Sequence, residues 1–179
     1  MSAENGEFLE RDLLGEYKDQ FVDIKLLENN INYDIYRAFG KKENLKVILK
    51  VIDINHLKQL DYDYHLNQIK REEEILGLCK SENILKLYRR LETKNKIIFV
   101  LENYKMNLAE YIVKYRKFEN DLEKLRDIIL GIGKGLKVLN KNGVIHRDIK
   151  PQNIFLIDMM MMMKMKMIKK MFFLLFQVY

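Results

Sequence analysis

Runs of β-branched and aromatic residues, separated by short polar stretches, predict a group of β-strands in the first part of the chain. Five segments have this pattern: residues 21–27, 35–38, 46–52, 84–88 and 97–101. The Asn-rich segment 28–34 predicts a turn between the first two strands, and the polar segment 92–96 predicts a turn between the last two. We therefore expect a mostly antiparallel sheet.

The strand expected at residues 46–52 would have two faces that differ in chemistry. Side chains alternate along a strand, so one face would carry only apolar residues, Val47, Leu49 and Val51. The other face would carry Ile48, Lys50 and Ile52. A lysine on an apolar face requires a partner, which makes Lys50 a candidate functional residue.

Helical periodicity appears in two longer segments. In residues 61–80 an apolar stripe recurs at helical spacing, formed by Leu66, Ile69, Leu76 and Cys79. Residues 121–141 hold a 3.6-residue period, with Leu122, Leu125, Ile128, Ile129, Ile132, Leu136 and Leu139 as its apolar positions. Asn142-Gly143 would end this helix. The order of elements predicts an α+β fold, a β lobe with one inserted helix followed by the beginning of a helical lobe.

Composition narrows the class of protein. The 179 residues are 48% hydrophobic and carry a net charge of +6, with basic and acidic residues mostly interleaved, which argues against nucleic-acid binding. Cys79 is the sole cysteine, so an internal disulfide is excluded and a reducing, intracellular and cytoplasmic location is expected. The N-terminus lacks the apolar core of a secretory signal, and the apolar run 171–179 is too short for a stable membrane span.

The segment His146-Arg147-Asp148-Ile149-Lys150-Pro151-Gln152-Asn153 carries the clearest chemistry. An aspartate, a lysine two residues later and an asparagine five residues later can share one rigid loop. Asp148 could accept a proton from an attacking hydroxyl, Lys150 could neutralise a moving phosphoryl group, and Asn153 could bind Mg²⁺ through its amide oxygen. The segment also follows a long amphipathic helix and precedes an apolar strand at residues 154–157.

This segment resembles the catalytic loop of eukaryotic serine/threonine protein kinases. The resemblance implies a protein-kinase-like fold that transfers the γ-phosphoryl group of ATP, with Mg²⁺, to a hydroxyl of a protein substrate. It also implies that Lys50 matches the strand lysine that binds the ATP phosphates. Its implied partner is Glu72, which lies within the apolar stripe of its helix, and Glu73 and Glu74 are competing candidates.

The resemblance extends to the adenine pocket. Residues 97–108 resemble the family's fifth strand and hinge, where Leu101 would guard the back of the pocket. Backbone groups of Glu102 and Tyr104 would bind adenine, and Asn107 would lie near the ribose. Two further residues of the nucleotide site would be Ile35, on the family's second strand, and Ile48, where the family commonly has alanine.

The sequence departs from the family's pattern in two further places. The phosphate loop of the family is glycine-rich, whereas the matching residues 28–33 contain no glycine, and Glu28 adds a negative charge. Asparagine tolerates left-handed geometry, so the turn can still form. The Asp-Phe-Gly metal site is absent from the sequence, and Asp158 follows Asn153 too closely to replace it. A catalytically inactive pseudokinase or kinase fragment acting as a binding scaffold is therefore the alternative to an active kinase.

Four regions are expected along the chain: an N-terminal extension (1–19), a kinase N-lobe (20–102), a hinge with a partial C-lobe (103–158) and a Met/Lys-rich tail (159–179). We expect the domain to be truncated. The tail composition suggests a shifted reading frame, because GAT and AAA codons read one base late give ATG and AAG. Sequencing the transcript beyond the codon for Asp158 would test this hypothesis.

Two other patterns are not expected to be functional sites. Gly131-Ile132-Gly133-Lys134-Gly135 resembles a phosphate-binding loop, but it lies inside a helical period and follows no strand. His56 and His65 have no companions at metal-ligand spacing, and Cys79 is expected in a core. The apolar helix 121–141 would normally be covered, so we expect it to form an aggregation-prone or partner-binding surface here.

Overall fold

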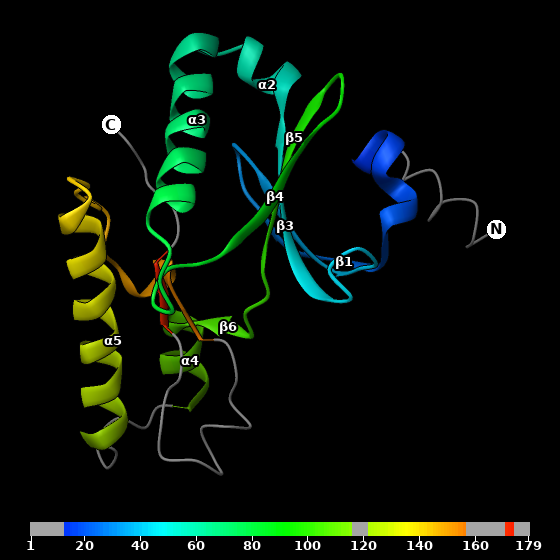
Figure 1. The fold of residues 1–179 in the computed structure, drawn as a ribbon. Helices are drawn as coiled ribbons and strands as arrows, with labels where there is room; N and C mark the ends of the chain where they lie inside the picture. The colour runs from blue at the N-terminus through cyan, green and yellow to red at the C-terminus, as the bar shows by residue number, and fades with distance from the viewer. Residues whose placement is uncertain (1–12, 116–121, 157–170, 174–179) are drawn as a thin grey trace. The chain divides into compact units, whose positions relative to one another are not determined.

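The computed structural model describes residues 13–115, 122–156 and 171–173 (Figure 1). The chain folds as two compact units. The first, called the sheet unit here, consists of residues 1–67 and 87–103, and the second, the helical unit, consists of residues 68–86 and 104–179. Each unit is described by itself.

The sheet unit is built on an antiparallel sheet of five strands in the order β1-β2-β3-β5-β4. The strands are β1 (Phe21–Asn29), β2 (Asp34–Gly40), β3 (Leu45–Asp53), β4 (Leu87–Glu92) and β5 (Lys96–Glu102). Their positions confirm the α+β fold expected from the sequence, with an antiparallel β-sheet preceding a helical segment.

The fourth strand differs from its expected bounds of 84–88. A turn occupies its predicted start, because the Ile84 amide donates to the Ser81 carbonyl at 3.2 Å and the Asn83 amide donates to Ser81 Oγ at 3.1 Å. At the other end, charged residues stay within the strand. Arg89 is one of them, and its Nε lies 2.6 Å from Glu43 Oε1. Arg89 is thus ion-paired to the turn between β2 and β3, and the strand continues beyond its predicted end at residue 88.

One face of the sheet packs into a hydrophobic core. The core cluster contains Val47, Leu49 and Val51 of β3, which confirms the predicted division of that strand into two faces. Ala38 of β2 and Val100 of β5 lie in the same cluster. Leu13 and Leu14 also pack into it, although the sequence assigned them to an N-terminal extension.

Three helical segments accompany the sheet. A 3-10 helix, η1 (Gly15–Gln20), precedes β1, and α2 (Ile54–Lys58) follows β3 directly. The Asp53 carboxylate caps α2 by accepting from the amides of Asn55 and His56. The longer α3 (Tyr62–Leu78) begins in the sheet unit and continues into the helical unit, close to the expected bounds. The single helix expected in this region is therefore preceded by a short second one.

The helical unit contains α4 (Leu108–Tyr115), α5 (Leu122–Lys141) and the 3-10 helix η2 (Pro151–Asn153). A small antiparallel sheet, in the order β6-β7-β8, joins them. Its strands are β6 (Met106–Asn107), β7 (Ile154–Leu156) and β8 (Met171–Phe173). Among the described residues of this unit, one hydrophobic core cluster contains Met106, Leu108, Tyr111, Ile128, Ile154 and Leu156.

Helix α5 ends as its sequence predicts. Gly143 has a φ of 70°, in the left-handed region that a residue without Cβ adopts readily. Its amide donates to the Asn140 carbonyl at 2.9 Å, and the Val144 amide donates to the Leu139 carbonyl at 2.9 Å. These two bonds form a Schellman cap, which satisfies carbonyls at the helix end. The glycine pattern at residues 131–135 lies within the helix, so it is not a phosphate loop.

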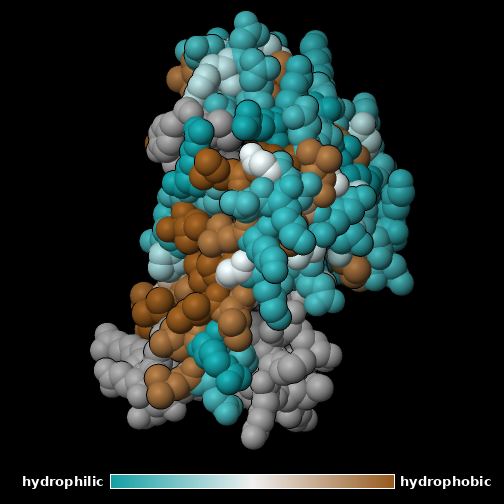
Figure 2. Space-filling model, turned by 60° about the vertical axis from the view of Figure 1, so that its left-hand side comes forward, coloured by the Kyte–Doolittle hydropathy of each residue, from teal (hydrophilic) through white to brown (hydrophobic). Residues whose placement is uncertain are grey.

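Helix α5 also exposes part of its apolar surface. Leu122, Ile129 and Leu130 are 75%, 58% and 52% exposed. Figure 2, whose view brings the α5 side of Figure 1 forward, shows hydrophobic side chains gathered on that surface. By contrast, Ile128 and Leu139 of the same helix are buried. The apolar stripe of α5 is thus wider than the part of the helix surface that is buried.

Most of the expected tail, residues 159–179, lies outside the described residues, and the shifted-frame hypothesis stays a prediction. The described part is β8, which pairs with β7 through Leu156 and Met171. Within the described residues, no helix has the length and apolarity needed to cross a bilayer.

Candidate active site

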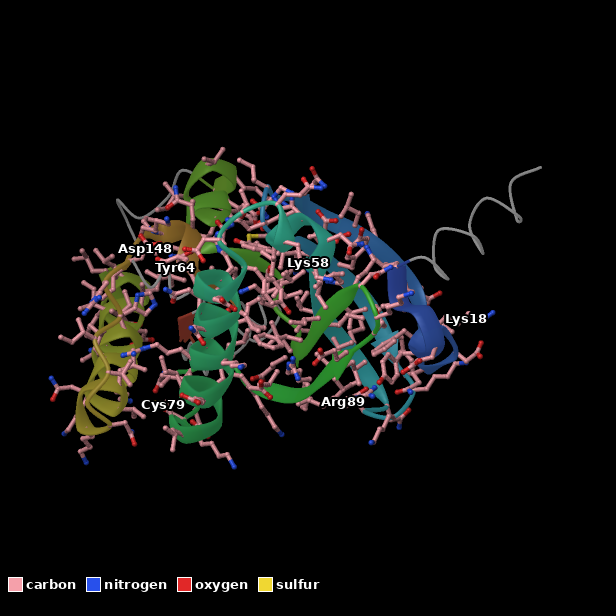
Figure 3. The ribbon with its side chains drawn as sticks, turned by 90° about the horizontal axis from the view of Figure 1, so that it is seen from above. Lys18, Lys58, Tyr64, Cys79, Arg89 and Asp148 are labelled. Atoms are coloured by element: carbon pink, nitrogen blue, oxygen red, sulfur yellow. The ribbon has the colours of Figure 1, made fainter. Side chains whose placement is uncertain are left out.

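The catalytic segment predicted at residues 146–153 lies between α5 and β7, and Figure 3 labels Asp148 within it. Arg147 has a φ of 66°, so the backbone turns sharply at this position. His146 is buried, and its Nδ1 accepts a hydrogen bond from the Asp148 amide at 3.2 Å. A histidine just before the aspartate thus supports the bend that presents Asp148.

Asp148 accepts from the other two predicted catalytic and metal residues, Lys150 and Asn153. Lys150 Nζ lies 2.8 Å from Asp148 Oδ2. Asn153 Nδ2 donates to the same oxygen at 2.9 Å and to the Asp148 carbonyl at 2.9 Å. The Asn153 amide in turn donates to the Lys150 carbonyl at 2.9 Å, which closes the η2 turn. The structure therefore brings Asp148, Lys150 and Asn153 together in one small loop.

These contacts set the charge state of the loop. The hydrogen bond from Lys150 lowers the pKa of Asp148, and the Asn153 hydrogen bond and the positive charge of Lys150 act in the same direction, against a smaller effect of burial. Asp148 is therefore ionised at neutral pH and can accept a proton. Burial lowers the pKa of His146, although the nearby Asp148 charge opposes the shift. His146 is therefore mostly neutral at pH 7, consistent with an Nδ1 that accepts a hydrogen bond.

The orientation of the Asn153 amide suits a magnesium ligand. Asn153 is buried, and its Nδ2 is directed at Asp148 by two hydrogen bonds. This assignment of the amide follows from the hydrogen-bond network, and it leaves Oδ1 as the acceptor atom. Mg²⁺ prefers oxygen ligands and usually takes few from the protein, with phosphates and water completing its shell. Among the described residues, no group of three His, Cys, Asp or Glu side chains could hold a metal ion.

The candidate nucleotide residues of the sheet unit share one face of the sheet. Ile35 on β2 is paired with Lys50 on β3, and Ile48 on β3 is paired with Leu101 on β5. Ile48 and Lys50 are two residues apart and therefore point to the same side. This side is opposite the core cluster that contains Val47 and Leu49. Residues from three strands are thus placed on one surface by strand register.

Two aromatic rings lie near the Lys50 ammonium group. It is only 4% exposed, and its Nζ lies 4.8 Å from the centre of the Tyr33 ring. The Phe99 ring, on the residue paired with Lys50 in β5, has its centre 6.0 Å from the same nitrogen. Both distances permit a cation–π interaction, which partly compensates a buried ammonium group.

Burial favours Glu72 over its two neighbours as the helix carboxylate. Glu72 is 5% exposed and lies on the buried side of α3 with Ile69 and Ile75. Glu73 is half-buried and Glu74 is exposed. Glu72 belongs to the helical unit and Lys50 to the sheet unit, so the pairing of the two stays a prediction.

The residues expected at the hinge have different surroundings. Glu102 is paired with Val47, so its side chain lies on the core side of the sheet, and the adenine contact expected of it involves only the backbone. Tyr104 is buried and packs against Phe155 with ring centres 4.1 Å apart. The Asn107 side chain caps α4 by accepting from the Glu110 amide at 2.8 Å.

The turn that replaces the glycine-rich loop closes without any left-handed residue. The Asn30 amide donates to the Tyr33 carbonyl at 3.1 Å, and Asn29 Nδ2 donates to Asp34 Oδ1 at 2.7 Å. Residues of the described chain with positive φ all lie elsewhere. The expected tolerance of asparagine for left-handed geometry is therefore not used here. Ile31, at the tip, is 86% exposed.

A cleft of about 710 Å³ lies elsewhere, beside η1 and β4. Arg89, labelled in Figure 3, is one of its lining residues. Arg89 makes the lining basic, but its guanidinium group already donates hydrogen bonds to Glu43 and Gln20. It is therefore not available to bind an anion. None of the candidate nucleotide residues lines this cleft.

Cys79 is buried as expected, and burial raises the pKa of its thiol.

Comparison with known proteins connects this geometry to relatives. Calcium-dependent protein kinase 4 of Plasmodium falciparum is 30% identical over 142 residues, which cover 78% of this chain and 26% of that protein. The Aurora kinase of Schizosaccharomyces pombe is 32% identical over 123 residues, 68% of this chain and 33% of that protein. CBL-interacting protein kinase 26 of Oryza sativa is 33% identical over 122 residues, 68% of this chain and 24% of that protein.

The chain thus spans only a quarter to a third of the length of these curated relatives. A family model, the protein kinase domain, matches residues 33–168. The match includes β2, β3, α3, β5 and the catalytic segment, all of which carry candidate site residues. This family model covers more than half of the residues of the chain, so the chain belongs to the protein kinase domain family.

Proposed function

We propose that the chain carries the nucleotide-binding face and the catalytic loop of a serine/threonine protein kinase. The observation that carries this proposal is the Asp148 carboxylate, which accepts from both Lys150 and Asn153. A charged surface loop without function would not require a lysine and an asparagine to converge on one aspartate oxygen. The Lys150-Pro151 pair after the aspartate favours serine and threonine over tyrosine as acceptors.

The proposed reaction transfers the γ-phosphoryl group of ATP to a serine or threonine hydroxyl of a protein. The hydroxyl oxygen forms a bond to the γ-phosphorus, and the bond from that phosphorus to the β,γ-bridging oxygen breaks, releasing ADP. The hydroxyl proton passes to the Asp148 carboxylate, which the lowered pKa keeps ionised. Lys150 supplies positive charge beside Asp148 during the transfer.

The remaining predicted residues would bind the nucleotide. Lys50 would contact the ATP phosphates, with Glu72 holding its ammonium group. The side chains of Ile35, Ile48 and Leu101 would contact adenine, and the backbone of Glu102 and Tyr104 would bind its edge. Asn153 Oδ1 would hold Mg²⁺, which neutralises phosphate charge when bound. Support comes from the shared sheet face of Ile35, Ile48, Lys50 and Leu101.

Replacing the proposed proton acceptor tests the function. The 179-residue chain and its Asp148→Asn variant are incubated with γ-labelled ATP, Mg²⁺ and a mixture of serine- and threonine-containing peptides. Asp63→Asn is the matched control, because Asp63 is exposed on α3. We expect label on serine or threonine with the wild type and the control, and a loss of at least about 100-fold with Asp148→Asn. Equal transfer by all three proteins would contradict the proposal.

Binding without transfer is a second candidate function. It is favoured by the glycine-free turn at residues 28–33 and by the lack of an Asp-Phe-Gly sequence. A thermal shift with millimolar MgATP separates the two candidates. If MgATP stabilises the chain but no Asp148-dependent phosphoryl transfer is measured, the result would support a nucleotide-binding scaffold. If MgATP does not stabilise the chain, the result would support a scaffold that does not bind nucleotide.

A further inference from the structure

The side chain of Tyr33 lies over the lysine that is the candidate phosphate ligand. Tyr33 ends the turn between β1 and β2, two residues before Ile35, which is paired with Lys50 in the sheet. Alternation along the chain directs residues 33 and 35 toward the same side. The centre of the Tyr33 ring lies 4.8 Å from Lys50 Nζ, at a distance typical of a cation–π interaction.

This contact has an electrostatic role. Lys50 is 4% exposed, and a buried ammonium group is unfavourable without compensation. The negative face of the Tyr33 ring supplies part of this compensation, and Phe99 supplies another part from a ring centre 6.0 Å away. A phosphate that binds Lys50 must approach its ammonium group to about 2.8 Å, and the Tyr33 ring occupies part of the space around that nitrogen. Ring and phosphate therefore compete.

The turn permits the ring to move without unfolding. Its closing hydrogen bond joins the Asn30 amide to the Tyr33 carbonyl, both backbone atoms. A second bond joins the side chains of Asn29 and Asp34. Rotation of the Tyr33 side chain breaks neither bond. The ring can therefore leave Lys50 while the hairpin stays closed.

We propose that Tyr33 is a positioning residue that occupies the phosphate-binding side of Lys50 and weakens nucleotide binding until it is displaced. The proposal rests on the proposed function, because it requires ATP phosphates to bind at Lys50. A smaller side chain at position 33 would leave the ammonium group open to phosphate. Tyr33 thereby determines how strongly the site discriminates ATP from adenosine, which has no phosphate to compete.

Equilibrium binding of MgATP and of adenosine to the 179-residue chain tests this proposal. The variants are Tyr33→Ala, which removes the ring, and Tyr33→Phe, which retains it. Leu60→Ala, at an exposed position outside the turn and the candidate nucleotide face, is the matched control. We expect Tyr33→Ala to bind MgATP about 2- to 30-fold more tightly, the range that a cation–π interaction supplies. Adenosine affinity, and the MgATP affinity of the other two variants, should match the wild type.

The outcomes separate this inference from the proposed function. Unchanged or weaker MgATP binding by a folded Tyr33→Ala variant, with adenosine still bound, would overturn the role of Tyr33 and leave the nucleotide site standing. If no protein bound either compound, both proposals would fail. Should Tyr33→Ala not fold by circular dichroism, Tyr33→Thr decides the question, since threonine is smaller than tyrosine, lacks the ring and suits an extended backbone. Threonine must then also tighten MgATP binding for the inference to hold.

Discussion

At the scale of single residues, the chemistry of the chain centres on one carboxylate oxygen, Asp148 Oδ2. Two donors, from Lys150 and Asn153, converge on it. All three side chains could be predicted from the sequence, because they lie within six positions of one another and a tight loop brings them together. The contact of Tyr33 with Lys50 could not be predicted, because it depends on strand register and on a side-chain rotamer.

Removing the lysine should change the titration of the aspartate. Lys150 is the largest cause of the lowered pKa of Asp148, so Lys150→Ala should raise that pKa toward its ordinary value of 3.8. A pKa lowered by folding stabilises the protein above the ordinary value, and this stabilisation is lost as the pH falls through the folded value. The Lys150→Ala variant should lose part of this stabilisation. Carboxyl NMR titration measures the shift, and an unchanged Asp148 pKa would refute the ion pair as its cause.

His146 should make stability depend on pH in a different range. Burial lowers its pKa below the ordinary 6.5, so near and below pH 6.5 the unfolded chain binds a proton that the folded chain does not. Folding stability should therefore fall as the pH drops from 7.5 to 5.5. Urea denaturation at several pH values measures this trend. His146→Gln should show a flatter dependence over that range, and an equally steep one would exclude His146 as its source.

At the scale of elements, hydrophobic periodicity was enough to place most strands and both long helices. The predicted bounds of the strand that starts at Leu87 were wrong. Periodicity does not show the turn contacts at Ser81 or the ion pair of Arg89. Helix α4 was missed, although its signal was present. Asn107 and Glu110 form a reciprocal capping box, in which the Asn107 amide donates to Glu110 Oε2 at 3.0 Å. The spacing Asn-x-x-Glu before an apolar run could have revealed it.

The capping box should measurably stabilise α4. Asn107→Ala removes the acceptor for the Glu110 amide, so we expect a loss of about 1 kcal/mol in the free energy of unfolding. Urea denaturation followed by circular dichroism measures it. Asn55→Ala is a matched control, because that exposed asparagine contributes only its backbone amide to the cap of α2. Equal stability of Asn107→Ala and the wild type would show that the box is unimportant.

At the scale of the whole molecule, the exposed apolar side of α5 should dominate behaviour in solution. Leu122, Ile129 and Leu130 are more than half exposed, and contiguous apolar surface promotes association. We expect the 179-residue chain expressed alone to be poorly soluble or bound to chaperones. The double variant Ile129→Lys and Leu130→Glu should increase the soluble fraction in a sedimentation assay, and it is the background in which the unfolding and binding measurements are made. A wild-type monomer with a sharp, reversible two-state melt would contradict this expectation.

We propose that Asp148 and Lys150 act as one catalytic unit in phosphoryl transfer. The most direct test measures the rate of γ-phosphoryl transfer for the wild type, Asp148→Asn, Lys150→Ala and the double variant. Residues that act through one contact give losses that are not multiplicative. We predict that the double variant transfers phosphate no more than about threefold more slowly than the slower single variant. Losses that multiply in the double variant, or transfer that neither change affects, would contradict this shared role of Asp148 and Lys150.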